Sequence, residues 1–554
     1  MTIPTPVHPT RALAQSPLFQ NLPVALPKEE QTALSYARAK AVAPIYNMSV
    51  EDVAYMSEKF WLCHTDPIWT MDGAACTLYT IQINLCAGTL ARYLKQQPYL
   101  KETLQKVLSF EYSGQFCLTE VGHGLNALHL ETTATLENGE FVLNTPSDGA
   151  AKFMPPTKPM GDRCVAVVFA STIVEGENHG VKPFLVPIND GVNMHPGVIC
   201  KVLPHRGGSH PVNHSLTYFN NVRLPMTALL GPLEKPQDPR TSFLSLISRV
   251  AVGTIAIGSL GVPALQVASY IAAKYSLRRT ITDSKGLTIP IISLRTQQAP
   301  ILIALAQAFV MKAFQAAAVK VFMNQSLDFR VRHAVATIMK VVVMQHSKAA
   351  SLGLGDRCGA QGLFEINQLF SVFCDLRGSA IAEGDTLALS IRLASELLLR
   401  RYGVPTTNDP KSLLALHEEG LFRELQAILK DIGHHRASDF DRLVLPECLP
   451  LVQAIGHRMA YDAAISAGVD LCLIDLYAAS CVRLDSSWYV ENQGLSRIQQ
   501  REVEAAVIDR VFPKTEEFLY KMGVEPYIIA PIISEERWED YISSLPPYSP
   551  SSSA

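Results

Sequence analysis

The chain has 554 residues, a formal net charge of −3, 48% hydrophobic residues and 18% charged residues. This length is enough for several domains with large cores, and the low charged fraction indicates much buried surface, some of it at subunit contacts. The charges are nearly balanced and form no block of one sign, which argues against a nucleic-acid partner. Eleven cysteines without a Cys-x-x-Cys pair argue against a zinc site or a disulfide framework and favour a reducing compartment.

Both ends of the chain are expected to be flexible, over residues 1–27 and 544–554. The first 30 residues lack the continuous apolar core of a secretory signal and do not form an amphipathic transit helix. The last residues, "PPYSPSSSA", differ from the Ser-Lys-Leu peroxisomal address. We therefore expect an intracellular protein without a clear targeting signal.

In chain order, the patterns predict an α+β multidomain protein. Apolar residues at three- and four-residue spacing indicate helices, whereas short β-branched and aromatic runs between turns indicate a mostly antiparallel β-domain. Proline-rich linkers separate the later blocks. The predicted domains are an N-terminal helical domain (28–112), a β-domain (113–230), a helical bundle (243–402) and an additional C-terminal helical domain (412–540).

The clearest local signal in the β-domain is Glu137-Asn138-Gly139, between the runs "LETTATL" and "EFVLN". Asn-Gly readily adopts the positive φ angles of a two-residue turn, so a tight hairpin is predicted here.

Residues 250–273 carry no charge and are long enough to span a bilayer. Gly253, Gly258, Gly261 and Pro263 weaken this stretch as an isolated helix, Ser, Thr and Gln recur in it, and no second comparable segment is evident. We therefore expect a buried helix of a soluble bundle and no membrane span.

Gly122-His-Gly124-Leu-Asn-Ala127 satisfies the loose G-x-G-x-x-G/A pattern of a dinucleotide-binding loop. Such a loop needs a helix immediately after it, so that the helix N-terminus meets the pyrophosphate. The following segment reads as strand and turn, so the match is interpreted as accidental.

A set of motifs resembles the acyl-CoA oxidases, the larger relatives of the acyl-CoA dehydrogenases. In order they are "LTEVGHGLN", "LETTAT", "FVLNTP", "VKPFLVPI", "NNVRLP", "YSLRRT", "RTQQAPILIALAQAFVM" and "AEGDTLALSIRLASELL". The resemblance implies a helical domain, a central β-domain, a helical bundle and an extra C-terminal helical domain. It also implies FAD between the β-domain and the bundle, a homodimer, and a peroxisomal role in fatty-acid β-oxidation, with a cytoplasmic location as the alternative.

Glu383 precedes an amphipathic segment for which Asp385 is a candidate N-cap, so its carboxylate could simply complement the helix dipole. The resemblance implies instead that Glu383 removes the α-proton of an acyl thioester, on CoA or on a carrier protein, while the β-hydride passes to flavin N5. Shielding from water would raise the pKa of such a carboxyl group toward a value useful for a general base. In an oxidase the electrons then reduce O₂ to hydrogen peroxide; in a dehydrogenase they pass to an electron-transfer flavoprotein. Asp385 and His123 are the candidate substrate-binding residues.

The resemblance further implies that Thr119 binds the isoalloxazine and that Gly122 and Gly124 let the backbone pass close to cofactor and substrate. A satisfied hydroxyl at a strand edge is the alternative for Thr119.

For the remainder of the FAD, the resemblance implies contact of Arg278 or Arg279 with the pyrophosphate, which the guanidinium fork suits. The alternative for either is a cation at a helix C-terminus. Gln297 and Gln298 match a pair near the adenine, or are ordinary glutamines on a helix surface.

The chain departs from the oxidase pattern at Pro156, which stands where those enzymes have a glycine that meets the flavin. Proline lacks an amide donor and fixes φ. The segment "CGAQG" (358–362) likewise stands where the oxidases have a "GHGY"-like segment that leads to the active-site loop. These changes leave room for a specialised acyl thioester, for a non-thioester substrate, or for a flavin-free binding homologue. No metal is expected, since His434 and His435, if helical, point in different directions.

Overall fold

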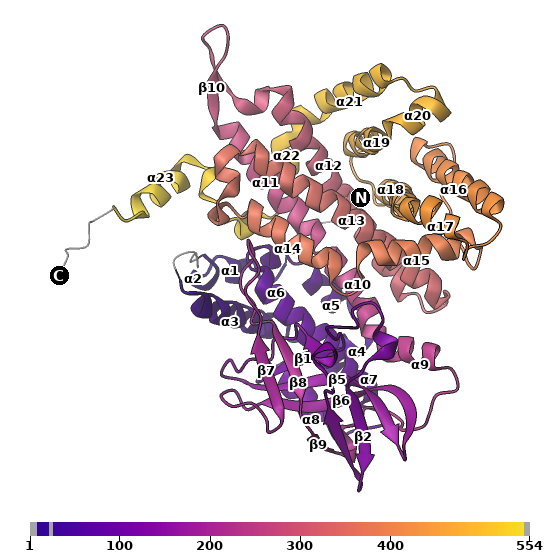
Figure 1. The fold of residues 1–554 in the computed structure, drawn as a ribbon. Coiled ribbons are helices and arrows are strands. Elements are labelled where there is room, and N and C mark those ends of the chain that lie inside the picture. The colour runs from indigo at the N-terminus through magenta and orange to yellow at the C-terminus, as the bar shows by residue number, and fades with distance from the viewer. Residues whose placement is uncertain (1–7, 21–25, 548–554) are drawn as a thin grey trace. The chain divides into compact units, whose positions relative to one another are not determined.

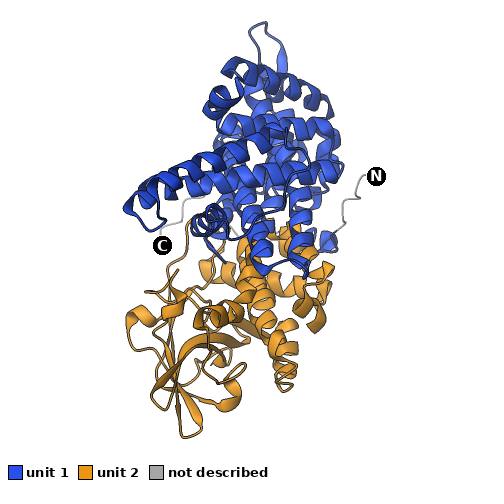
Figure 2. Cartoon of the chain, turned by 90° about the vertical axis from the view of Figure 1, so that its right-hand side faces the viewer, with its two compact units in different colours: residues 1–15, 257–554 blue, residues 16–256 orange. Residues whose placement is uncertain are grey.

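The computed structural model describes residues 8–20 and 26–547 (Figure 1). The chain divides into two compact units, residues 16–256 and residues 1–15 with 257–554 (Figure 2). Each unit is taken by itself below.

The unit of residues 16–256 begins with helices. Ser49 and Asp52 form a capping box at the start of α4, and the Asp72 carboxylate caps α6 by accepting from the Ala75 amide at 2.8 Å. The buried Arg38 guanidinium lies 3.1 Å from the same carboxylate and balances its charge. The helices are α2 (Pro17–Gln20), α3 (Lys28–Tyr46), α4 (Val50–Tyr55), α5 (Glu58–His64), α6 (Gly73–Thr80), a π-helical segment (Ile81–Ala87), α7 (Gly88–Tyr93), α8 (Leu100–Leu108) and, after the strands, α9 (Pro239–Leu246).

The strands of this unit form two sheets. The larger has the order β1-β5-β2-β3-β9, with β6 also paired to β5, and the smaller has the order β4-β8-β7. The expectation of antiparallel pairing needs correction, because β1 and β2 both run parallel to β5 and the larger sheet is mixed. The strands are β1 (Tyr112–Cys117), β2 (Thr133–Glu137), β3 (Glu140–Asn144), β4 (Lys152–Phe153), β5 (Arg163–Val174), β6 (Glu177–Asn189), β7 (Val198–Val202), β8 (Ser215–Phe219) and β9 (Val222–Pro225).

The predicted hairpin is confirmed between β2 and β3. Glu137 pairs with Glu140, and Asn138 and Gly139 both have positive φ angles, 52° and 81°. On the inner face of the larger sheet, Phe141 and Phe184 meet edge to face with ring centroids 5.0 Å apart and belong to one continuous core cluster.

The second unit is helical apart from one small hairpin. Helices α11, α12 and α13 pack on one another and form its centre (Figure 1). A Cβ at Gly261 on α11 would lie 2.5 Å from Val343 on α13, so glycine permits this close helix contact. The elements are α1 (Arg11–Ala14), α10 (Ser248–Ser259, which begins in the other unit), α11 (Gly261–Arg278), β10 (Thr280–Thr282), β11 (Thr288–Pro290), α12 (Arg295–Met323), α13 (Phe329–Arg357), α14 (Leu369–Ile381) and α15 (Thr386–Leu398).

The helices of the additional C-terminal block follow residue 412. α18 packs against α12, α13 and α15, and α19 packs against α12 and α18. A Cβ at Gly456 on α18 would lie 2.2 Å from Val342, so α18 and α13 also approach closely. The helices are α16 (Leu413–Ile432), α17 (Ser438–Leu443), α18 (Cys448–Ser466), α19 (Leu471–Leu484), α20 (Ser486–Gln493), α21 (Arg497–Val511), α22 (Thr515–Met522) and α23 (Glu535–Ser544).

The terminal segments expected to be flexible are described only in part. Within 1–27, α1 and α2 are helical and bury Ala14 and Phe19, while residues 1–7 and 21–25 lie outside the described residues. Of the predicted tail, α23 reaches Ser544 and residues 548–554 lie outside the described residues.

Three described helical stretches are long and apolar enough, by length and composition, to cross a membrane: Gly73–Tyr93, Ser248–Arg278 and Arg295–Met323. The expectation that residues 250–273 have no comparable counterpart is therefore wrong. In these three stretches 89%, 83% and 67% of the most apolar window is buried inside the protein, which agrees with the predicted burial of 250–273.

Candidate active site

Glu383 lies in the short turn between α14 and α15. Its φ angle is 50° and that of the next residue, Gly384, is 99°, so two successive residues adopt left-handed backbone. A non-glycine residue in this region is uncommon and is retained only where neighbouring structure holds it. Directly after the turn, the Asp385 carboxylate accepts hydrogen bonds from the amides of Leu387 (2.9 Å) and Ala388 (3.0 Å). The predicted N-cap is confirmed.

Lys340 holds this turn from the side of α13. Its side chain is completely buried, and its ammonium group donates to the carbonyl oxygens of Ala382 and Gly384, the residues on either side of Glu383. Burial lowers the pKa of Lys340 to about 8, although the nearby Glu383 and Asp385 act in the opposite direction. Sequence reasoning missed Lys340; the available signal was a single lysine within the apolar run "ATIMKVVVM".

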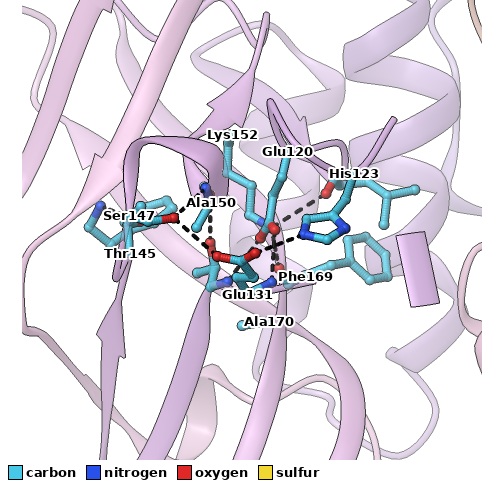
Figure 3. A network of polar contacts seen from close by, with 12 residues as sticks. Glu120, His123, Glu131, Thr145, Ser147, Ala150, Lys152, Phe169 and Ala170 are labelled. Atoms are coloured by element: carbon cyan, nitrogen blue, oxygen red, sulfur yellow. Dashed lines mark hydrogen bonds and ion pairs between the residues drawn. The ribbon is translucent and has the colours of Figure 1, made fainter. Parts of the chain in front are cut away.

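In the unit of residues 16–256, the "LTEVGHG" motif forms a corner around a buried ion pair (Figure 3). The Lys152 ammonium lies 2.9 Å from the Glu120 carboxylate, and both side chains are completely buried. Glu120 also accepts from the amides of Glu131 (2.8 Å) and Thr132 (3.0 Å), and Lys152 donates to the Phe169 carbonyl (2.6 Å). Burial lowers the pKa of Lys152, and the Glu120 charge opposes that change. This pair was not predicted, because its members lie on separate segments.

The candidate flavin-binding residues lie on the same segment as Glu120. The Thr119 carbonyl accepts from the Phe153 amide at 2.8 Å, and the Gly122 amide donates to the Gly149 carbonyl at 2.8 Å. A Cβ at Gly124 would meet no described atom within 4 Å, so the protein alone does not require glycine there.

His123 donates from Nε2 to the Glu131 carboxylate at 3.1 Å, while its buried Nδ1 has no partner in the described part of the chain (Figure 3). The chain then continues through a 3-10 turn (Ala127–His129) into β2. The interpretation of Gly122–Ala127 as an accidental match to a dinucleotide loop is confirmed.

Arg278 ends α11 and is tied to α23. Its guanidinium lies 2.6 Å from the Glu535 carboxylate and 5.9 Å from the centroid of the Trp538 ring, and its buried Nε has no partner among the described residues. The neighbouring Arg279 caps the helix through its backbone, donating to the Tyr275 carbonyl at 2.8 Å.

Gln297 and Gln298 lie in the first turn of α12 and are 9% and 7% exposed. The alternative that they are ordinary surface glutamines is therefore wrong. The Gln297 amide donates to the Ser276 hydroxyl (3.2 Å) and the Arg357 carbonyl (3.0 Å), and the Gln298 amide donates to the Ser293 carbonyl (3.5 Å).

The stretch that departs from the oxidase pattern is well packed. Pro156 is buried, and Met154 before it has a φ of 61°. His214 donates from Nδ1 to the Met154 carbonyl at 2.7 Å, which stabilises this conformation; burial lowers the pKa of His214 to about 4. The 358–362 segment follows α13 as a 3-10 turn, where a Cβ at Gly362 would lie 2.1 Å from the Gly355 carbonyl oxygen.

The expectation that His434 and His435 are helical and diverge is wrong. They follow the end of α16 at Ile432, and their rings stack with centroids 4.9 Å apart. The tight turn after Gly433, which has a φ of 77°, brings the two rings together.

The element order and the mixed sheet are those of the acyl-CoA oxidase fold. Acyl-CoA oxidase 3 from Yarrowia lipolytica superposes with a TM-score of 0.83 at 17% identity, over 98% of this chain and 89% of that one. Acyl-CoA oxidase-1 of Caenorhabditis elegans, solved in complex with FAD and ATP, gives a TM-score of 0.79 at 18% identity, over 97% of this chain and 90% of that one. These likenesses establish the fold class.

Sequence comparison points to the same group. Residues 253–398 match the family model "Acyl-CoA oxidase, C-alpha1 domain". Acyl-coenzyme A oxidase acox-3 of C. elegans is 30% identical over 57% of this chain and 51% of its own length. Peroxisomal acyl-coenzyme A oxidase 3 of Homo sapiens is 27% identical over 70% of this chain and 59% of its own length. The match spans about half the length of these curated relatives, and the resemblance to the acyl-CoA oxidases is confirmed.

Proposed function

We propose that the protein catalyses the FAD-dependent α,β-dehydrogenation of an acyl thioester, with Glu383 as the base that removes the α-proton. The observation that carries this proposal is the Glu383 turn. It lies inside the segment that matches the acyl-CoA oxidase domain, and Lys340 and the Asp385 cap hold it on both sides.

The chemistry requires a carboxylate that is fixed in place and partly shielded from water. Glu383 is half-buried, and it lies in a left-handed turn outside the helices before and after it. Removal of the α-proton puts negative charge on the thioester, so a fixed base positioned against that carbon lowers the barrier. FAD, when bound, supplies the acceptor for the β-hydrogen and its electron pair. O₂ is the proposed final electron acceptor, as in the oxidases that the chain resembles.

Two described features support ligand binding. Among the described residues, the buried Arg278 Nε and His123 Nδ1 have no hydrogen-bond partner, so the first offers a polar atom to FAD and the second offers one to substrate. Arg278 would hold the diphosphate, with Arg279 beside it, and the Thr119–Gly124 corner would hold the isoalloxazine. Gln297 fits less well as a donor, because its amide hydrogens already go to Ser276 and Arg357.

The substrate proposed is an acyl thioester on CoA or on a carrier protein. The buried Pro156, which offers no amide donor, favours a specialised acyl group over a common fatty acid. His123 and Asp385 remain the proposed substrate contacts, and a homodimer and a peroxisomal location are proposed from the resemblance.

The test is spectral. The purified protein should absorb at about 450 nm as a flavoprotein, and an acyl-CoA should bleach that band under anaerobic conditions. Glu383→Gln should slow bleaching by roughly 10³-fold or more while the flavin content stays unchanged. Stoichiometric peroxide on admission of air would identify an oxidase. A colourless protein that cannot be reconstituted with FAD would support the flavin-free alternative, and bleaching by Glu383→Gln at the parent rate would refute the base assignment.

A further inference from the structure

Three buried side chains that the proposed reaction does not use converge in the helical unit. His346 lies on α13, His457 on α18 and Cys481 on α19, and their ligand atoms all lie within 4.8 Å of one another. None of the three is more than 5% exposed. Each comes from a different helix, so helix packing brings this cluster together.

The two imidazoles are buried among helices, where the neutral form, which keeps a lone pair for a metal, is favoured over the charged form. His346 Nε2 is buried and has no hydrogen-bond partner among the described residues.

The other imidazole is already oriented by a neighbour. His457 Nε2 lies 2.9 Å from the Gln345 side-chain oxygen. An amide oxygen only accepts, so Nε2 carries the hydrogen and Nδ1 carries the lone pair. Metal-binding histidines commonly donate their other ring hydrogen in this way, which fixes the ring.

We propose that His346, His457 and Cys481 bind one Zn²⁺ ion. Tetrahedral zinc with bonds of about 2.0–2.3 Å places neighbouring ligand atoms roughly 3.3–3.6 Å apart, so small side-chain rotations would close the present cluster around the ion. Water would complete the coordination. Zinc binds cysteine as the thiolate, so binding displaces the Cys481 thiol proton, and one proton leaves for each ion bound. This proposal replaces the expectation of no metal.

An ion here would connect two parts of the helical unit. α13 lies within the segment that matches the oxidase domain and carries Lys340, whereas α18 and α19 belong to the C-terminal block. Metal bound only by the folded chain stabilises it, so zinc should raise the melting temperature.

The experiment uses the full-length chain without a histidine tag, stripped with a chelator and titrated with Zn²⁺ and separately with Co²⁺. We expect one equivalent of either ion, and with Co²⁺ a thiolate charge-transfer band in the near ultraviolet. Cys481→Ser should abolish that band, and Cys481→Ser and His346→Gln should each weaken Zn²⁺ binding by at least about 100-fold. Cys472→Ser is the matched control, since Cys472 is on the same helix and is 4% exposed against 3% for Cys481.

The wild-type chain alone can overturn the proposal, even where a variant fails to fold. Absence of tight stoichiometric binding, or Co²⁺ bound without a thiolate band, would exclude this site. An unchanged band in Cys481→Ser, or loss of the band in Cys472→Ser, would also contradict it.

Discussion

The ammonium group of Lys340, on α13, donates a 2.7 Å hydrogen bond to the carbonyl oxygen of Gly384, directly after Glu383. It also donates to the carbonyl of Ala382, directly before Glu383. One buried cation therefore forms hydrogen bonds to the backbone on both sides of the proposed base. Because both hydrogen bonds go to backbone carbonyl oxygens, they set the position of the main chain at Glu383.

Removing these two hydrogen bonds should lower the catalytic rate without loss of the cofactor. For Lys340→Met we expect kcat/KM to fall by about 100-fold, because a misplacement of about 1 Å at a reacting group has an effect of that size. The Lys340→Arg variant keeps the charge and should recover part of the loss. The measurement is the rate of anaerobic flavin bleaching, with the flavin content determined for each variant. Lys320→Met, an exposed lysine on α12, is the control and should behave as the wild type. A wild-type bleaching rate in Lys340→Met would show that the Glu383 turn keeps its conformation without Lys340.

The same lysine should impose a pH dependence. Its pKa is about 8 in the folded protein and has its ordinary value near 10.5 in the unfolded chain. Below about pH 8 the group is charged in both states. Between the two values only the unfolded chain keeps the proton, so this group makes the fold more stable as pH rises. The catalytic rate should instead fall as pH rises, because a neutral amine binds the two carbonyl oxygens more weakly than an ammonium group does.

We therefore expect the bleaching rate to fall as pH rises through about 8. Single-turnover rates in wild type and Lys340→Arg measure this, since arginine stays charged throughout the range. An identical alkaline limb in both proteins would assign the titration to another group.

The buried pair Glu120–Lys152 should be strongly coupled. Either Glu120→Gln or Lys152→Met leaves one uncompensated buried group and should lower the free energy of unfolding by about 3–5 kcal/mol. The double variant should recover much of that loss, because no unpaired charge remains. Denaturant unfolding of the four proteins gives the coupling energy.

The exposed pair Lys40–Asp162 serves as the comparison. Its atoms are 3.0 Å apart, but its side chains are 50% and 42% exposed, so its removal should change stability by less than about 1 kcal/mol. Equal losses of unfolding free energy for the two pairs would contradict the conclusion that burial makes the Glu120–Lys152 pair strongly coupled.

Asp385 has a confirmed structural role and a proposed contact with substrate, and two variants separate them. Asp385→Ala should destabilise the protein by about 1 kcal/mol through loss of the α15 cap, whereas Asp385→Asn keeps a capping oxygen and should be nearly neutral. If Asp385 also contacts substrate, Asp385→Asn should raise KM at unchanged stability. Unchanged KM in Asp385→Asn would leave it as a cap alone.

The local sequence determined the elements and the candidate residues. Asn138-Gly139 predicted the hairpin because its turn angles depend on two residues only, and apolar spacing predicted the helical bundle (243–402) in which α12 lies. The order of the motifs likewise identified the resemblance, since it requires no knowledge of contacts.

The tertiary structure alone decided which of these elements meet. Four features join segments that are distant in the chain. They are the parallel pairing of β1 and β2 with β5, the hydrogen bonds of Lys340 to the Glu383 turn, the Glu120–Lys152 pair, and the cluster of His346, His457 and Cys481. A periodic pattern indicates which face of an element is buried, but not which other face covers it. Buried charges and ligands depend on that second fact, because burial stabilises them only when a partner from another segment is present.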